Sequence, residues 1–405
     1  MSKYKRVFIC DPLAVNDKGH NSQSVRLFAS YFESVGLDAH IVCSKEMSSP
    51  KNMVPIFNYP YRGYISLIKF KFKNIWFTKF SNFAYLLFVK IVEALLCLFL
   101  RKERWTSILK RNYIKLINKF NLDEQDLIIL TSADYYSIIA LSKLESSVLK
   151  KLNIHIRLIG VMENASYARG SVKRRWIRAI KEIKKQANCL TLSSEVYSYS
   201  EYLEKILCLE VLTISYPLAD KLKISKTKNN VANISMVGCG RKDKGFFEIK
   251  KIEYELANAN VNYQIIAQDM DEYDLSYSKK YSYGLTDSRQ ITLLPSHLTD
   301  DEIESLYSCA DIILLPYDSG VYKYRGSAVY QEGLSYGKLF VCYSGSGMDA
   351  WINKYGNGIL VQNHTGVAMA IAKLLSLSSE EVANIVNAAK KKYVNDFQLA
   401  IKRVI

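Results

Sequence analysis

The sequence of 405 residues predicts an α/β fold made of two Rossmann-like domains, each with a parallel sheet. Short apolar segments that read as strands alternate with segments of helical periodicity, first over residues 4–214 and again from residue 233. Pro217 lies between the two series and restricts the backbone there, as expected of a link between domains. The chain is also long enough to form two cores.

The first series opens with strand, helix and strand, which is the βαβ unit of a parallel sheet. We expect a strand over 4–10, a loop over 11–21, a helix that ends near Gly36 and a strand over 39–43. The loop contains no complete Gly-x-Gly-x-x-Gly, so the dinucleotide fingerprint is absent. Further strands are predicted over 127–130, 154–161, 189–192 and 211–214, with a basic helix over 172–187.

The second series starts with a strand over 233–237, followed by a basic loop and a helix that we expect to open at Phe246. Thr299 and Glu302 form the signature of a capping box at the start of a helix over 299–309. The remaining strands are predicted over 263–267, 291–294, 311–315, 339–343 and 359–361, and a last helix from residue 379 to the end.

A basic and aromatic segment, 60–120, interrupts this rhythm. Between residues 61 and 120, 13 Lys and Arg stand against two Glu and are mixed with 14 aromatic residues. Its apolar window 84–100 is shorter than the about 20 residues of a spanning helix and contains Lys90 and Glu93. A buried helix and a helix on an anionic membrane surface both remain open for this segment.

The composition limits the classes of protein. The net charge is +16, but the sequence has no helix-turn-helix, RRM, KH or zinc-finger pattern that would support nucleic-acid binding. The eight cysteines are scattered, without Cys-x-x-Cys or zinc spacing, which favours a reduced, cytosolic compartment and no metal site. The N-terminal apolar run is too short for a secretion signal.

The loop 238–245 is the first candidate site. Gly238 and Gly240 allow a ligand to approach the backbone closely, and Arg241 and Lys244 add positive charge next to the predicted helix. This combination suits a diphosphate group. The alternative is a solvated basic turn.

A second candidate site follows the strand 311–315. Arg325 and Ser327 stand before a predicted helix, whose free backbone N–H groups and neighbouring guanidinium suit a phosphate. Ser327 is also expected to cap that helix. Glu332 lies inside the helix, where its carboxylate can accept hydroxyl groups of a sugar or ribose, or is only solvated.

The segment 311–343, with its Glu-Gly-Leu-x-x-Gly-Lys helix, resembles the donor-binding segment of nucleotide-sugar glycosyltransferases of the GT-B architecture. It is most similar to the large retaining family that builds bacterial polysaccharides. The resemblance implies two domains facing a cleft, with residues 1–215 on the acceptor side and 216–385 binding the donor. It also implies a last helix, 386–405, that crosses back to the first domain.

The resemblance assigns roles to the candidate residues. Arg241 and Lys244 would contact the donor's pyrophosphate and stabilise the leaving diphosphate, which makes a metal unnecessary. The family motif has two glutamates eight positions apart; Glu332 matches the second, but Tyr324 stands in place of the first. This departure leaves the donor sugar and the stereochemical outcome open. The strand end near His297 would border the nucleotide base.

On the N-terminal side, the loop with Gly19 would face the cleft, and Gly19 would contact the donor there. Glu163 follows the strand 154–161, where family members often hold a catalytic or sugar-contacting residue. In an inverting enzyme Glu163 or His20 would act as the general base, whereas in a retaining enzyme, which the resemblance favours, Glu163 would position the sugar. Asp11 is a further acceptor-side candidate, with a turn role beside Pro12 as the alternative.

The sequence thus predicts a transferase that moves a sugar from a nucleotide-diphosphate donor to a glycan or polyprenyl-linked acceptor, without a metal or other cofactor. The expected setting is bacterial surface polysaccharide synthesis, such as capsule or O-antigen, in the cytoplasm and on the inner face of the membrane. The alternatives are a nucleotide-sugar epimerase or phosphorylase of the same architecture and, because of Tyr324, a non-catalytic scaffold that binds sugar nucleotides or membranes.

Overall fold

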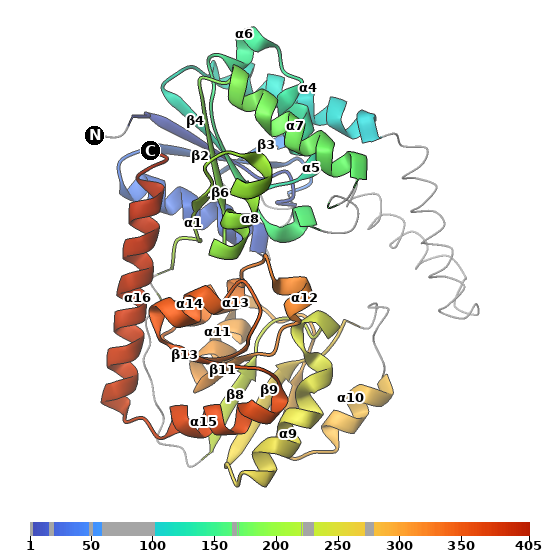
Figure 1. Ribbon diagram of the computed structural model, residues 1–405, viewed down its shortest axis with the longest axis vertical. Helices are drawn as coiled ribbons and strands as arrows, with labels where there is room; N and C mark the ends of the chain where they lie inside the picture. The colour runs from blue at the N-terminus through green and yellow to red at the C-terminus, as the bar shows by residue number, and fades with distance from the viewer. Residues whose placement is uncertain are drawn as a thin grey trace, which may run out of the picture. The chain divides into compact units, whose positions relative to one another are not determined.

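The structure is a computed structural model that describes residues 3–15, 20–47, 52–58, 102–163, 168, 170–219, 221, 231–271 and 279–405 (Figure 1). Most of the basic and aromatic segment expected over 60–120 lies outside these ranges, and so does Gly19. The chain forms two compact units. Unit 1 contains Met1–Ser193, Leu203–Leu212 and Val404–Ile405, and unit 2 contains Ser194–Tyr202 and Thr213–Arg403.

Unit 1 is built on a sheet of seven strands in the order β3-β2-β1-β4-β5-β6-β7. The strand pairs from β3 to β5 run parallel, and all residues of β4 are buried, as expected of a sheet covered on both faces. The strands are β1 (Arg6–Cys10), β2 (Asp38–Ser44), β3 (Met53–Phe57), β4 (Asp126–Ala133), β5 (Asn153–Leu158), β6 (Cys189–Ser194) and β7 (Leu212–Thr213).

Strand β3 was not predicted from the sequence. Its Pro55 removes a backbone donor, which argues against a strand in the middle of a sheet. The structure places β3 at the edge of the sheet, paired only with β2, where a proline is tolerated.

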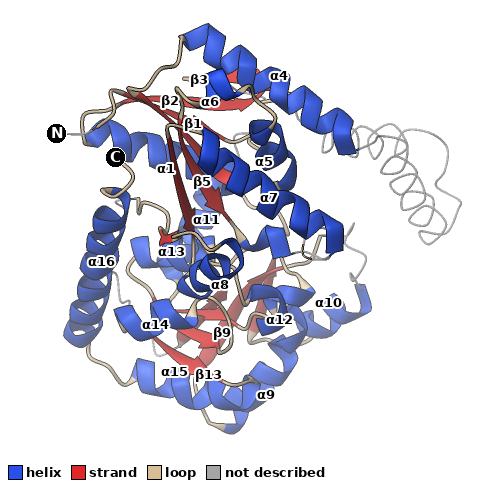
Figure 2. Ribbon diagram, turned by 45° about the horizontal axis from the view of Figure 1, so that its top comes forward, coloured by secondary structure: helices blue, strands red, loops and turns tan. Residues whose placement is uncertain are grey.

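Helices cover this sheet, as Figure 2 shows with helices in blue and strands in red. Helix α4 buries Leu109, Tyr113 and Leu116 and packs against α5, so its apolar face belongs to the core. Helix α7 buries Trp176 and Ile180 and also packs against α5. The helices are α1 (His20–Ser34), α4 (Lys102–Phe120), α5 (Tyr135–Ser142), α6 (Ser146–Leu149) and α7 (Gly170–Gln186), followed by α8 (Tyr197–Leu207), whose residues up to Tyr202 belong to unit 2.

Unit 2 is built on a sheet of six strands in the order β10-β9-β8-β11-β12-β13, and all neighbouring strands of this sheet run parallel. Its core joins strand residues such as Ile234, Ile265 and Val341 to Ile252 and Ile371 of the covering helices. The strands are β8 (Ala232–Met236), β9 (Tyr263–Gln268), β10 (Ile291–Leu294), β11 (Ile312–Leu315), β12 (Leu339–Tyr343) and β13 (Gly358–Val361).

Helices α11 and α16 of unit 2 begin with capping boxes. Thr299 and Glu302 form the predicted capping box of α11, and Ser378 and Glu381 form a second one at the start of the long helix α16. The helices are α9 (Ile249–Asn258), α10 (Lys279–Thr286), α11 (Asp300–Cys309), α12 (Ser319–Tyr322), α13 (Ala328–Ser335), α14 (Asp349–Tyr355), α15 (Val367–Leu375) and α16 (Ser379–Ile401).

Both sheets have a point where the chain reverses its lateral direction. In unit 1 this point lies between β1 and β4, and in unit 2 between β8 and β11. Open α/β sheets bind ligands beyond the carboxyl ends of the strands at such points. Among the helices in the described ranges, none is long and apolar enough to cross a membrane.

Candidate functional site

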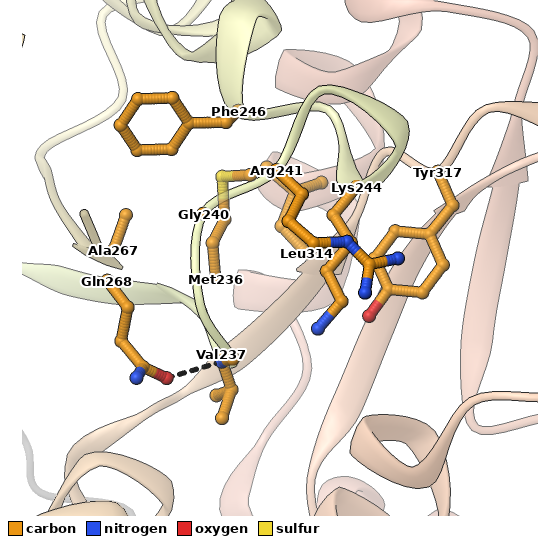
Figure 3. A pocket seen from close by; sticks show the side chains of 11 residues that line it. Met236, Val237, Gly240, Arg241, Lys244, Phe246, Ala267, Gln268, Leu314 and Tyr317 are labelled. Carbon is orange, nitrogen blue, oxygen red and sulfur yellow. Dashed lines mark hydrogen bonds between the residues drawn. The ribbon is translucent and has the colours of Figure 1, made fainter. Parts of the chain in front are cut away.

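A pocket lies at the reversal point of unit 2, beyond the carboxyl ends of β8, β9 and β11 (Figure 3). Its position is the one that the strand order predicts for a ligand. It brings together Gly238, Gly240, Arg241 and Lys244 of the loop 238–245. The complete lining is Met236, Val237, Gly238, Gly240, Arg241, Lys244, Phe246, Ala267, Gln268, Leu314 and Tyr317.

Gly238 makes room for Lys244. Its φ of 92° lies in the left-handed region, and a Cβ there would lie 2.6 Å from the Lys244 ammonium nitrogen. The backbone N–H of Gly238 donates to Gln268 Oε1 at 2.5 Å, which ties the loop to the end of β9 (Figure 3). Any side chain at position 238 would therefore displace the ammonium group.

The Lys244 ammonium is a desolvated cation. Burial, and next the positive charge of Arg241, lower the pKa of Lys244 from 10.5 to about 8. In the part of the chain that the structure describes, no side chain or carbonyl forms a hydrogen bond or ion pair with it. An anion bound in the pocket would supply the missing partner and raise the pKa again.

Arg241 is already engaged. Its Nε donates to Asp243 Oδ1 at 2.8 Å, its Nη2 binds the other carboxylate oxygen, and the same Nη2 donates to Tyr322 Oη at 3.1 Å. The bond to Asp243 raises the pKa of Arg241 further. Its side chain is still 42% exposed, so part of the guanidinium faces outward. Figure 3 shows it next to Lys244 and Tyr317.

The expected helix at Phe246 starts later. Lys242–Lys244 and Phe246–Glu248 form two 3₁₀ turns, and α9 begins at Ile249. Gly240 serves internal packing, because a Cβ there would lie 2.6 Å from the Phe246 ring. The prediction that an α-helix N-terminus directly follows the loop was therefore wrong; the charged side chains, not α9, dominate this side of the pocket.

The segment after β11 provides the second group of candidate residues. Ser327 caps α13 as predicted, with its Oγ accepting from the Tyr330 backbone N–H at 3.3 Å. Burial raises the pKa of the Tyr322 hydroxyl to about 12, while the charges of Arg241 and Arg325 oppose the rise. Both guanidinium groups therefore act on the same hydroxyl.

Glu332 is half-buried in α13, and its Oε2 accepts from Tyr307 Oη at 2.7 Å. Its negative charge also reaches Lys244, where it favours the charged ammonium. The carboxylate is thus oriented by a neighbouring helix and is coupled to the pocket. His297, by contrast, is 79% exposed, lies 3.5 Å from Asp271 and does not line the pocket.

In unit 1, Asp11 lies at the reversal point beside β4 and is fully buried. Its carboxylate accepts from the Leu13 N–H at 2.8 Å and from Thr131 Oγ1 at 3.4 Å. Burial raises the pKa of Asp11 from 3.8 to about 7, and these hydrogen bonds limit the rise. The carboxylate fixes the turn at Pro12, which is the turn role that the sequence left open.

Of the other acceptor-side candidates, the structure describes the side chain of Glu163. Glu163 lies outside the strand, because β5 ends at Leu158 and Glu163 closes a 3₁₀ turn, Gly160–Glu163. Its Oε2 lies 3.5 Å from the Lys173 ammonium. His20 is the first residue of α1, and its side chain, like the whole of Gly19, lies outside the described residues.

Several residues of the site were missed by sequence reasoning. Gln268, Tyr317 and Tyr322 line or border the pocket, and Asp243 and Tyr307 hold candidate residues in place. Gln268 had a usable signal, because it ends a strand next to β8. Across the residues that the structure covers, no three His, Cys, Asp or Glu side chains converge as metal ligands.

The lowered pKa of Lys244 predicts a pH dependence. Deprotonation removes the charge that attracts a diphosphate, so the affinity for UDP or GDP should fall as the pH rises through about 8. Titration calorimetry between pH 6.5 and 9.5 measures this fall. Lys244→Arg, which stays charged, should flatten the profile; a flat wild-type profile would contradict the role of Lys244.

Neither a protein-family model nor a curated protein sequence matches the chain. The chain is similar to a structure described as trehalose-6-phosphate from E. coli bound with UDP-2-fluoro glucose, at a TM-score of 0.63 and 10% identity, over 98% of both chains.

Two further solved structures are similar over almost their whole length. One is sucrose-phosphate synthase from Thermosynechococcus elongatus, at a TM-score of 0.58 and 13% identity, over 99% of this chain and 96% of that one. The other is WaaG, a glycosyltransferase involved in lipopolysaccharide biosynthesis, at 0.52 and 12%, over 98% and 96%. These likenesses show the fold, which is the GT-B architecture of two Rossmann-like domains that the sequence predicted.

Proposed function

We propose that the protein is a glycosyltransferase that binds a nucleotide-diphosphate sugar in the pocket of unit 2. The observation that carries the proposal is the desolvated Lys244 ammonium at the reversal point of the sheet. Burying the positive charge of Lys244 lowers the stability of the folded protein unless a ligand supplies a counter-charge. Buried charges of this kind are found most often at functional sites. The likeness to a structure bound with UDP-2-fluoro glucose supports this class of ligand.

The arrangement suits the departure of a diphosphate. When the bond from the sugar's anomeric carbon to the phosphate oxygen breaks, negative charge grows on the leaving group. Lys244 and the outward part of Arg241 would stabilise that charge. The N-terminus of α13, with Ser327 and the nearby Arg325, offers further donors. Glu332, oriented by Tyr307, would accept hydroxyl groups of the donor.

The retaining outcome rests on the resemblance of the segment 311–343 to the polysaccharide-building family. In that scheme the leaving phosphate helps to take the acceptor proton, and no separate base is needed. Glu163 or His20 would be the base for the inverting alternative. Analysis of the anomeric configuration of the product by NMR separates the two outcomes.

The acceptor is proposed to be a glycan on a polyprenyl diphosphate, as in bacterial surface polysaccharide synthesis. Helix α7 supports an anionic acceptor, because Arg174, Arg175 and Arg178 line a surface pocket together with Ser171, Val172 and Tyr135. Within the described residues, no carboxylate pairs with Arg174 or Arg178. The likeness to WaaG, which is involved in lipopolysaccharide biosynthesis, points to the same setting.

The donor reaction is tested by incubating the protein with a panel of nucleotide sugars and a polyprenyl-linked acceptor. Release of the nucleoside diphosphate together with a lengthened acceptor supports the transferase. Binding of a nucleotide sugar without any turnover supports the scaffold, and interconversion of the donor sugar without an acceptor supports the epimerase. A lack of binding across the panel would end the proposal.

The acceptor site gives its own prediction. Replacing Arg174 and Arg178 by Ala should raise the KM for the lipid-linked acceptor about tenfold or more, because each cation near an anionic lipid group contributes about 1 kcal/mol. The control is Lys181→Ala with Lys185→Ala, which removes the same charge from exposed positions of the same helix but outside the pocket. Equal effects of the two pairs would mean that only net charge matters.

A further inference from the structure

A short segment that precedes and enters α8 is packed against the second candidate site. Ser194–Tyr202 belongs to unit 2, although the residues on both sides of it in the sequence belong to unit 1. It contacts the loop 318–327, which carries Arg325 and Ser327 and leads into α13. Ser198 Oγ donates to the Lys323 carbonyl oxygen at 2.9 Å, and Gly347 packs against Val196.

Glu195 is the residue of this segment that reaches Gly326, between Arg325 and Ser327. It is only 6% exposed. Its Oε2 accepts from the Gly326 N–H at 3.3 Å, and its Oε1 accepts from Gln331 Nε2 at 3.3 Å. One carboxylate therefore links Gly326, which lies between Arg325 and Ser327, to Gln331 near the start of α13.

The fit between Glu195 and Gly326 is close. A Cβ on Gly326 would lie 2.5 Å from the Glu195 Cδ and 2.7 Å from the Trp351 ring. The loop backbone thus rests directly on the carboxylate, and a side chain at position 326 would push Glu195 away. This contact fixes the position of the backbone at Gly326. It thereby also fixes the backbone that carries the Arg325 side chain and the capped N-terminus of α13.

Tyr324 takes part in the same packing. Its ring stacks on Tyr202 with 4.8 Å between the ring centroids and lies 5.4 Å from Tyr199. Position 324 is the place where the resembled motif has its first glutamate, and here it anchors the loop. The tyrosine that replaces the first glutamate of the motif therefore packs the loop against Tyr199 and Tyr202.

We infer that Glu195 is a positioning residue, which holds Gly326 and so sets Arg325 and the N-terminus of α13 for a nucleotide diphosphate. This inference rests on the proposed function. Glu195 acts through the loop and not on the ligand, because both of its oxygens accept from protein groups. What matters is that one side chain forms hydrogen bonds to both Gly326 and Gln331; a negative charge is not required.

Three variants separate these roles. Glu195→Ala removes both acceptors, and it should weaken UDP or GDP binding about tenfold and raise the donor KM more than it lowers kcat. Glu195→Gln keeps the bond to Gly326, and a flip of the Gln331 amide restores the second bond, so binding should stay within about twofold of wild type. Ser198→Ala removes another contact between the same segment and loop, but one at Lys323, and should also stay within about twofold.

Amide hydrogen exchange at residues 325–327 provides a readout that does not depend on activity. It should speed up in Glu195→Ala and stay near wild type in Glu195→Gln and Ser198→Ala. The inference is overturned if Glu195→Ala lowers only the melting temperature while binding, KM and exchange stay unchanged. It is also overturned if Glu195→Gln is as impaired as Glu195→Ala. A wild-type protein that binds no nucleotide diphosphate would reject the proposed function, whereas the exchange data would still test the loop contact.

Discussion

Lys244→Met is expected to lower sugar transfer by about 10²- to 10³-fold, the range seen when a preorganised group that stabilises developing negative charge is removed. The ammonium lies at the reversal point of the unit 2 sheet and is the desolvated cation of the pocket. Methionine keeps a long side chain in the same space beside Gly238. Steady-state kinetics with the donor found in the panel, together with calorimetric titration of UDP or GDP, measure the loss.

The control for this variant is Lys242→Met, at an exposed position of the same loop that does not line the pocket. It should keep nearly full activity. The pKa of Lys244 is about 8 in the folded protein and 10.5 in the unfolded chain. Between these pH values the unfolded chain keeps the proton that the folded protein has released. Burying the charge therefore opposes folding at pH 7, and Lys244→Met should melt at the same or a higher temperature. A variant that loses both activity and stability would argue for a structural role.

Gly245→Ala is expected to destabilise unit 2 by about 2–5 kcal/mol, from the sum of two effects. Gly245 has a φ of 79°, a left-handed conformation that costs about 1–2 kcal/mol for other residues. A Cβ there would also lie 2.3 Å from the Pro316 carbonyl oxygen, and forcing backbone apart in a packed region costs about 1–3 kcal/mol. Urea unfolding followed by tryptophan fluorescence measures the change.

The matched control is Gly284→Ala in α10, where a Cβ would meet no atom within 4 Å. Alanine favours a helix over glycine by about 0.5–1 kcal/mol, so this variant should be slightly more stable than wild type. If Gly245→Ala were equally harmless, the close approach of the loop 238–245 to the end of β11 would not be a constraint. That approach is what places Lys244 beside Tyr317 in the pocket.

The strands were predictable because each is a short apolar run followed by a polar loop. Strand β3 failed this rule through Pro55, and α5, with the sequence Tyr-Tyr-Ser-Ile-Ile-Ala-Leu-Ser, is too evenly apolar to show a helical period. The delayed start of α9 also escaped, because two 3₁₀ turns have no clear sequence signal. Tertiary contacts, such as the close approach of Gly245 to Pro316, set these local choices.

The candidate site was predictable only where a local motif carries it. Lys244 lies in the loop that follows β8, and Ser327 lies in the segment between β11 and α13, so their places near the sheet's carboxyl edge come from the chain order. Glu195 and Tyr307 act on residues 131 and 25 positions away, and nothing in the sequence pairs them. The pairing of Arg241 with Asp243 is local, but a sequence does not tell a free guanidinium from one held by a neighbouring carboxylate.

The buried carboxyl group of Asp11 couples folding to proton uptake. An unfolded chain releases this proton near pH 3.8, whereas the folded protein keeps it up to about pH 7. Between these values folding consumes a proton, so the contribution of Asp11 to the free energy of unfolding decreases as the solution is made more basic. Mild acidification should thus increase the contribution of this carboxyl group to the free energy of unfolding, the reverse of what salt-bridged carboxylates do in most proteins.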